Sequence, residues 1–198
     1  MLTLQLALLA PKLSSDAEVV GLPDLVIVVP YDPTWSGEFV TESKHILCAL
    51  GDNVASMYHI GSTAIPGIFA KPILDILLVV HDVFRLDSQA GSMKELGYEA
   101  MGEFGISGRR YFRKSNRLGV STHHVHAYQS GSADIERHIA FRDYLIAHPA
   151  EAQAYSALKR ELARVHPEDR QAYVNGKDAF VKEHEAKALD WRRSSISE

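Results

Sequence analysis

Hydrophobic residues in the first two thirds of the chain come in short runs, separated by loops that contain Gly and Pro. Runs of this length, rich in β-branched and aromatic residues and bounded by turn residues, are typical of strands. We therefore predict strands over residues 25–29, 54–60, 72–80, 111–114 and 120–128. The run over residues 72–80 is almost wholly apolar except for one acidic residue, which favours a central place in the sheet.

Helical patterns flank and follow these strands. Asp32 and Pro33 are typical of a helix start, and Gly51 suits the left-handed conformation that often ends a helix, so we predict a helix between them. Apolar residues at helical spacing predict further helices over residues 87–96, 133–147, 150–165 and 170–191.

A strand-rich part followed by a helical part indicates an α+β fold, with a mixed β-sheet, flanking helices and a C-terminal helical bundle. The length of 198 residues favours one domain, which we assign to residues 25–198. Residues 1–24 mix a Leu-rich start with a break that contains Pro and Ser. We expect an N-terminal extension there rather than a signal peptide, because the first Lys follows the apolar stretch.

Composition excludes several classes of function. The chain has 21 Lys and Arg against 25 Asp and Glu, a formal net charge of −4, which argues against binding to duplex nucleic acid. No window approaches the roughly 18 consecutive apolar residues that a membrane-spanning helix needs. Cys48 is the single cysteine, so no intrachain disulfide can form. We expect a cytoplasmic protein that does not use a membrane.

The most informative motif is Gly61-Ser62, followed after twelve residues by Asp75 inside the apolar run. A loop of small residues lets backbone amides approach a phosphate, and the Ser hydroxyl adds a donor. A carboxylate inside an apolar strand needs a cation, an Arg or several hydrogen bonds as partner. The position of Asp75 therefore predicts a site that holds a cation beside a phosphate-binding loop. The alternative is a structural role, in which Asp75 pairs with an Arg or caps a loop amide.

Several longer motifs occur together and in a fixed order. They are Tyr31-Asp32-Pro33 with Trp35, residues 59–67 (His-Ile-Gly-Ser-Thr-Ala-Ile-Pro-Gly), residues 71–76 (Lys-Pro-Ile-Leu-Asp-Ile), His124-Val125-His126, and residues 141–145 (Phe-Arg-Asp-Tyr-Leu). This set resembles the GrpB family, which is assigned to the nucleotidyltransferase superfamily and also occurs fused to dephospho-CoA kinases. The resemblance covers about residues 25–191. It implies a nucleotidyltransferase-like mixed sheet with flanking helices.

One departure from the superfamily pattern bears on the metal. Active nucleotidyltransferases usually carry a second carboxylate two residues after the first, because alternate strand residues face the same side and together hold Mg²⁺. Here that position is Leu77. A divalent cation, Mg²⁺ or Mn²⁺, then depends on Asp75, substrate phosphates and water.

Histidines offer a replacement for the second carboxylate. His124 and His126 project to one face of their strand. If Asp75 shares that face, the three residues form a candidate catalytic and metal-binding set that suits Zn²⁺, Mn²⁺ or Fe²⁺ better than Mg²⁺. Ordinary hydrogen-bonded strand histidines are the alternative.

Basic residues provide candidates for binding phosphate. Lys159 and Lys177 each follow a Tyr by four residues, so Tyr and Lys share a helical face. The predicted substrate-binding residues are Gly61, Ser62, Lys71, Arg110, Arg142, Lys159 and Lys177. For each Tyr–Lys unit alone, solvated charge over a Tyr ring is an equal alternative, and Arg142 fits either a structural ion pair or a wall of the pocket.

Three functions are compatible with these residues. The first is metal-assisted nucleotidyl or phosphoryl transfer from a nucleotide, or another phosphorylated small molecule, to an unknown small acceptor. The second is a binding module for the same ligands that does not catalyse, which the departure at Leu77 favours. The third is a hydrolase whose metal ion is held by Asp75, His124 and His126. It requires these side chains to lie within about 8 Å of one another, since ligand atoms sit about 2.0–2.2 Å from Zn²⁺.

Overall fold

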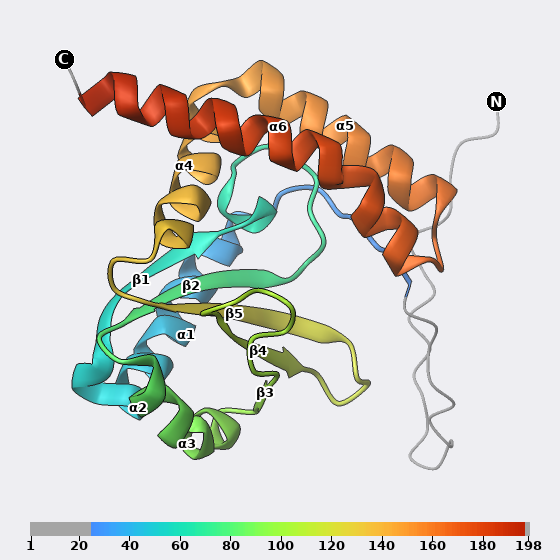
Figure 1. Cartoon of the computed structure of the whole chain (residues 1–198). Coiled ribbons are helices and arrows are strands. Elements are labelled where there is room, and N and C mark those ends of the chain that lie inside the picture. The colour runs from blue at the N-terminus through green and yellow to red at the C-terminus, as the bar shows by residue number, and fades with distance from the viewer. Residues whose placement is uncertain (1–24, 197–198) are drawn as a thin grey trace, which may run out of the picture.

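The computed structural model describes residues 25–196, and five strands form one mixed sheet at its centre (Figure 1). The strand order across the sheet is β1-β2-β5-β4-β3. The strands are β1 (Val54–Ile60), β2 (Leu74–Val80), β3 (Tyr98–Ala100), β4 (Arg110–Ser115) and β5 (Ser121–Gln129). The predicted α+β class with a mixed sheet is confirmed.

Strand β2 lies between β1 and β5, as its apolar composition predicted. It pairs antiparallel with β1 and parallel with β5, whereas β4 pairs antiparallel with both β5 and β3. The register sets Asp75 opposite Ile60 on one side and His124 on the other. The end of β1 and the beginnings of β2 and β5 therefore meet at one end of the sheet.

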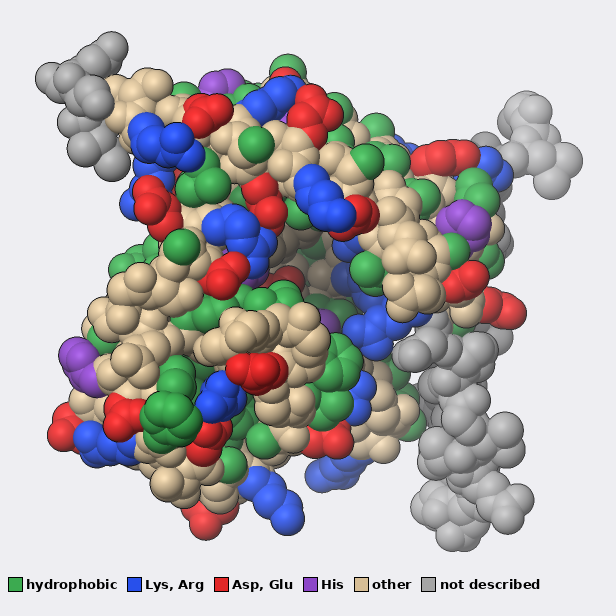
Figure 2. Space-filling model, in the orientation of Figure 1, with side chains coloured by type: hydrophobic (Ala, Val, Ile, Leu, Met, Phe, Trp, Pro, Cys, Tyr) green, Lys and Arg blue, Asp and Glu red, His purple; other side chains and the backbone are tan. Residues whose placement is uncertain are grey.

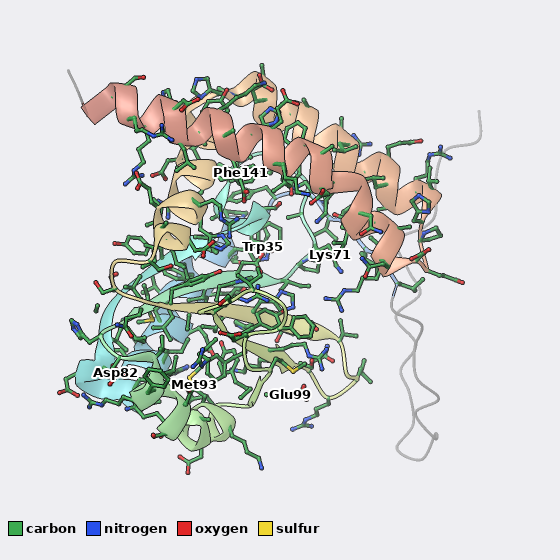
Figure 3. The ribbon with its side chains drawn as sticks, viewed as in Figure 1. Trp35, Lys71, Asp82, Met93, Glu99 and Phe141 are labelled. Atoms are coloured by element: carbon green, nitrogen blue, oxygen red, sulfur yellow. The ribbon has the colours of Figure 1, made fainter. Side chains whose placement is uncertain are left out.

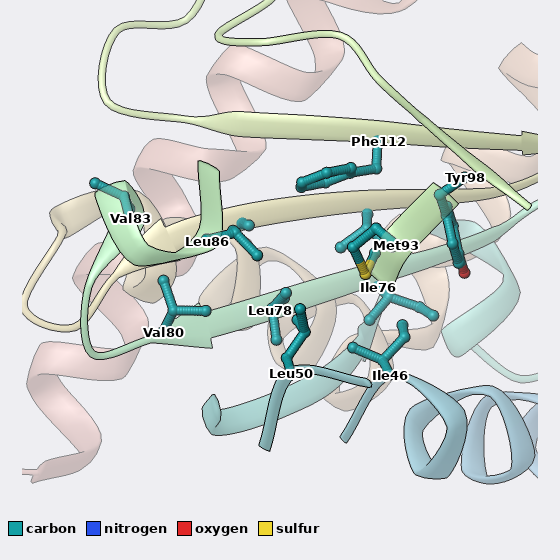
Figure 4. Close-up of a cluster of buried hydrophobic side chains, with 12 residues drawn as sticks. Ile46, Leu50, Ile76, Leu78, Val80, Val83, Leu86, Met93, Tyr98 and Phe112 are labelled. Atoms are coloured by element: carbon teal, nitrogen blue, oxygen red, sulfur yellow. The ribbon is translucent and has the colours of Figure 1, made fainter. Parts of the chain in front are cut away.

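Three helices cover one face of the sheet: α1 (Thr34–Leu50), α2 (Val83–Ser88) and α3 (Ala90–Glu95). Alternate residues of β2 point into this layer, and Figure 4 shows them against side chains of all three helices. Twelve buried residues form this core: Ile46, Leu50, Ile76, Leu78, Val80, Val83, Leu86, Met93, Tyr98, Phe112, Val125 and Ala127. At its edge, the buried carboxylate of Glu42 accepts from the hydroxyl of Tyr98 and from Lys114.

The other face is covered by the C-terminal helices α4 (Ala133–Ala147), α5 (Pro149–Val165) and α6 (Arg170–Ile196) (Figure 1). Ile139 of α4 packs on Leu77, Val79 and Tyr128 of the sheet. A second cluster joins α4, α5 and α6 to Ile65 and Ile68 of the loop between β1 and β2. The helical bundle is thereby attached to the loop that carries the Gly-Ser motif.

Some predicted elements differ from the observed ones. Residues 25–29 form no strand but a single bridge, Val29 with Ala70. The predicted helix over 87–96 is two short helices, because Gln89 leaves the helical conformation while its side chain bonds to Leu50 and Asn53. Strand β3 was not predicted, since a three-residue edge strand has little pattern of its own.

The ends of the chain and the longest helix complete the description. The predicted extension, residues 1–24, lies outside the described residues. Helix α6 continues beyond the predicted residue 191 to Ile196. Within residues 25–196, none of the helices is both long enough and apolar enough to cross a membrane.

Candidate functional site

Asp75, His124 and His126 converge on the sheet face that the C-terminal helices cover. His124 Nδ1 lies 3.2 Å from Asp75 Oδ1, and His126 Nε2 lies 3.7 Å from the same oxygen. The parallel register of β2 and β5 produces this cluster, because it sets Asp75 directly beside His124. These distances satisfy the proximity that the metal-dependent hydrolase requires.

Asp75 is held in its ionised form. Burial alone would raise the pKa of this carboxyl group, but the hydrogen bonds and charges of His124 and His126 outweigh it and lower the pKa well below its ordinary value. The side chain keeps 28% of its surface exposed. A carboxylate that is negative at every physiological pH and still reachable can attract a cation.

Arg109 determines how the proton of His126 is placed. Its Nη1 approaches His126 Nδ1 at 3.5 Å, and because an arginine only donates, this nitrogen accepts. The ring proton of neutral His126 then lies on Nε2, toward Asp75. On His124 the arrangement is reversed: Nδ1 donates to Asp75, and Nε2 is buried without a hydrogen-bond partner.

The Gly-Ser loop passes directly over the carboxylate of Asp75. Gly61 has φ 69°, and a Cβ built on it would lie 2.9 Å from the Cβ of Asp75, closer than real contacts allow. Glycine is therefore required both by the backbone and by the space. The loop is fixed behind this point by Thr63, whose buried hydroxyl accepts from His59 and donates to the Ile73 carbonyl.

Lys159 of α5 bonds to the hydroxyl of this loop. Its Nζ donates to Ser62 Oγ at 2.8 Å and to the Phe69 carbonyl, and it lies 4.4 Å from the centre of the Tyr155 ring. Only 2% of Lys159 is exposed. Burial, helped by the charge of Lys177, lowers the pKa of Lys159 to about 7. The C-terminal bundle thus supplies a buried amino group, cationic when protonated, to the predicted phosphate loop.

Lys177 and Lys71 extend this positive region along Tyr173. Lys177 Nζ lies 4.6 Å from the centre of that ring and Lys71 Nζ 5.9 Å. Burial is the main cause that lowers the pKa of Lys177 to about 8, and Lys71 adds to it while Asp75 opposes it. Each Tyr does lie on the helical face of its Lys, as predicted. Figure 3 places Lys71 just below α6, and Figure 2 shows a hollow between helices and sheet with Lys and Arg at its walls.

Two predicted substrate-binding arginines lie elsewhere. Arg110 projects to the opposite sheet face from Asp75, where its guanidinium bonds both carboxylate oxygens of Asp87 at 2.6 and 2.8 Å. The structure does not bring it to the cluster, because strand alternation turns it away. Arg142 donates to the His59 carbonyl and to Asp143, which favours the structural role over the pocket wall.

The donor set does not reproduce a three-residue metal centre. Within residues 25–196, no group of three or more His, Cys, Asp and Glu side chains is arranged to hold a metal ion. Asp75, His124 and His126 are close, but both imidazoles face the same oxygen of Asp75. Leu77 is fully buried against α4. The cluster therefore offers a cation one carboxylate, that of Asp75, and not a complete set of protein ligands.

Two further features of the structure are not among the predicted site residues. One is the buried Arg109, which directly precedes β4 and comes within 3.5 Å of His126 because β4 pairs with β5. The other is a pocket of about 200 Å³, to which Lys71 contributes. It is lined by Leu25, Ile27, Lys71, Pro72, Ile73, Leu118, Gly119, Val120, Ser121 and Arg170. Its walls come from segments far apart in the chain, so no local pattern could reveal it.

Comparison with known proteins identifies the family. The model of the family described as GrpB protein matches residues 25–187. The UPF0157 protein YqkA of Bacillus subtilis (strain 168) is 41% identical over 168 residues, 85% of this chain and 48% of that protein, so the chain spans about half the length of this relative.

Solved structures agree with this assignment. The crystal structure of conserved protein GrpB from Enterococcus faecalis matches with a TM-score of 0.80 and 43% identity, over 84% of this chain and 99% of that chain. The Cid1 poly(U) polymerase with MgGTP bound gives a TM-score of 0.46 and 10% identity, over 67% of this chain and 42% of that chain, which is too distant to support an argument. On the family model and the identities to its members, the chain belongs to the GrpB family.

Proposed function

We propose that this site binds the phosphate groups of a nucleotide, or of another phosphorylated small molecule, and transfers a nucleotidyl or phosphoryl group to a small acceptor. The observation that carries the proposal is the 2.8 Å contact between the almost fully buried Lys159 and the half-buried Ser62, with the ionised Asp75 beside the same loop.

The energetics of the lysines support an anionic ligand. Burying an ammonium group costs free energy unless an anion is near, and the lowered pKa values of Lys159 and Lys177 reflect that cost. Asp75 is the acidic group that favours their charged forms. A bound phosphate would supply the missing negative charge and make strong charge-assisted hydrogen bonds. Such a pair of lysines is costly in a purely structural role.

The remaining residues suit transfer chemistry. Asp75 would hold Mg²⁺ or Mn²⁺ together with phosphate oxygens, and the cation would neutralise charge that develops on them. His124 orients Asp75 through its Nδ1. His126 is 17% exposed beside the carboxylate, and we assign proton exchange with the acceptor to it, since imidazole is the most frequent proton-transfer group in enzymes.

Calorimetric titration tests the binding part. Wild type, Lys159→Met and Asp75→Asn would each be titrated with ATP and with tripolyphosphate, with and without Mg²⁺, Mn²⁺ or Zn²⁺. We expect Lys159→Met to weaken both ligands at least tenfold and Asp75→Asn to remove the metal dependence. Lys182→Met is the matched control, because Lys182 is an exposed lysine of α6 that pairs only with Asp178. Wild type that binds neither ligand would overturn the proposal.

A non-catalytic binding module is the second candidate, and the buried Leu77 favours it. Turnover separates the two. Release of pyrophosphate with a nucleotide adduct, or of ADP with a phosphorylated acceptor, lost in Asp75→Asn, would support transfer. Binding without product across a panel of small hydroxyl and amine acceptors would support the module.

A further inference from the structure

The loop between β3 and β4 carries an exposed aromatic ring in a strained conformation. Phe104 is 60% exposed and has φ 45°, and no other non-glycine residue in the described part of the chain has a positive φ. Glycines at positions 102, 105 and 108 also adopt positive φ. A phenylalanine in this backbone region is unfavourable and persists only where surrounding contacts impose it.

Arg109 imposes this conformation. Its Nη2 donates to the Phe104 carbonyl at 2.7 Å and its Nε to the Glu103 carbonyl at 3.2 Å. The Glu103 carboxylate in turn accepts from the Gly108 amide at 2.7 Å. Arg109 is itself 6% exposed. The loop is thus ordered by hydrogen bonds around the buried Arg109. It exposes the apolar ring of Phe104 to solvent in an unfavourable backbone conformation.

A continuous set of contacts connects this ring with the functional site. Phe104 stacks on Tyr111 with ring centres 5.2 Å apart and planes at 16°. The Tyr111 ring lies 5.4 Å from that of His124 and 5.3 Å from that of His126. Arg109 lies over Tyr111 at 5.0 Å and also contacts His126. The loop crosses in front of β5 in Figure 1.

We propose that Phe104 is the stacking platform for the nucleobase of a nucleotide whose phosphates bind at Ser62 and Lys159. This inference rests on the proposed function. It adds a binding site for the nucleobase, which the phosphate-binding residues Ser62 and Lys159 do not contact. Tyr111 supports one face of the ring, and the exposed surface of Phe104 is open to a planar ligand. Every base has a π-face, so the platform favours nucleotides over bare phosphates with little preference among bases.

The test compares ATP with tripolyphosphate in Phe104→Ala. Loss of one base–aromatic stack weakens binding by about 5- to 150-fold, so we expect the affinity for ATP to fall by that factor and the affinity for tripolyphosphate to stay within twofold. Phe104→Tyr should restore ATP binding. Phe84→Ala is the matched control, since Phe84 is 72% exposed and belongs to α2 on the other sheet face.

The outcomes separate the two proposals. If wild type binds neither ligand, the proposed function fails first. If wild type binds both and Phe104→Ala weakens both equally or neither, the platform is overturned while the phosphate site stands. If Val120→Ser in the apolar pocket weakens ATP selectively while Phe104→Ala does not, the base lies in that pocket instead.

Discussion

The two faces of the sheet differ although one strand contributes to both. On the first face, Ile76, Leu78 and Val80 of β2 are fully buried among the apolar residues of α1, α2 and α3. On the second face, β2 begins with Asp75, which meets two histidines and the Gly-Ser loop. A period of two along the strand is enough to separate a core from a polar site.

The second face is itself divided along β2. Beyond Asp75, this face of β2 is apolar, and Leu77 and Val79 pack on Ile139 of α4. The polar cluster is therefore confined to one end of the sheet, where the strand ends are open to the C-terminal helices. The continuous apolar layers provide most of the buried apolar surface that stabilises the fold. The charged side chains of the candidate site lie together at this end of the sheet.

Of the substitutions considered, Leu77→Asp should lower the free energy of unfolding most, because it places a charge in the apolar part of this face. The new carboxylate would lie in an apolar layer under α4, and an unpaired buried charge destabilises a protein by about 3–5 kcal/mol. Urea denaturation of the variant and of Leu77→Asn measures it. A loss below about 1 kcal/mol, with tighter Mg²⁺-dependent ATP binding, would instead mean that the site can accept the second carboxylate of nucleotidyltransferases.

Lys159→Met should stabilise the protein while it removes binding. The pKa of Lys159 is about 7 in the folded chain against an ordinary value of 10.5, so the unfolded chain binds more protons between these values and wild-type stability rises with pH there. The variant does not carry the free-energy cost of burying a protonated amino group. Its advantage should be roughly 2–4 kcal/mol at about pH 6.5 and shrink toward zero as pH approaches 10.5.

Denaturation of both proteins across this pH range provides the measurement for Lys159. Part of the gain is offset because the Ser62 hydroxyl and the Phe69 carbonyl lose a donor. A difference that does not change with pH would contradict a lysine whose charge is disfavoured by burial.

Gly61→Ala should have a smaller effect on stability and a specific one on the site. The left-handed backbone and the contact with Asp75 together should cost about 1–3 kcal/mol, and a displaced carboxylate should lose metal-dependent binding. Gly67→Ala is the control, because Gly67 has φ 77° but no atom within 4 Å of an added Cβ. The difference between the two variants in urea denaturation isolates the contact. Equal effects would exclude the close approach as the reason for glycine.

Arg110→Gln should have the smallest effect. It removes a surface ion pair with Asp87, worth about 0–1 kcal/mol, from the face without the cluster. Affinity for tripolyphosphate should stay within twofold of wild type in calorimetry. A tenfold loss would return Arg110 to the substrate-binding residues.

Much of the fold could be predicted from local pattern. Helix 133–147 and strand 54–60 have the observed bounds, because amphipathic spacing and turn residues act within a few positions of the chain. Residues 25–29 have the composition of a strand but form only one bridge, since pairing requires a partner that composition does not specify.

The candidate site could be predicted in part. Local sequence selects Gly61, Ser62 and Asp75, because glycine in a small-residue loop and a carboxylate in an apolar strand are unusual, and the structure brings Gly61 and both histidines to Asp75. Arg110 was chosen by charge alone, and the pairing of β4 with β5 turns it to the other face. Arg109, one residue earlier, makes the contact with His126.

By itself, the sequence determined the α+β class, the GrpB family and which residue types could do chemistry. The tertiary structure decided which of them meet: Lys159 and Ser62 are 97 positions apart, and their contact exists only because α5 packs over the loop. The physical reason is that periodicity and turn chemistry are local, whereas burial, pKa and side-chain contact depend on segments joined by packing. Distance along the chain does not encode those contacts.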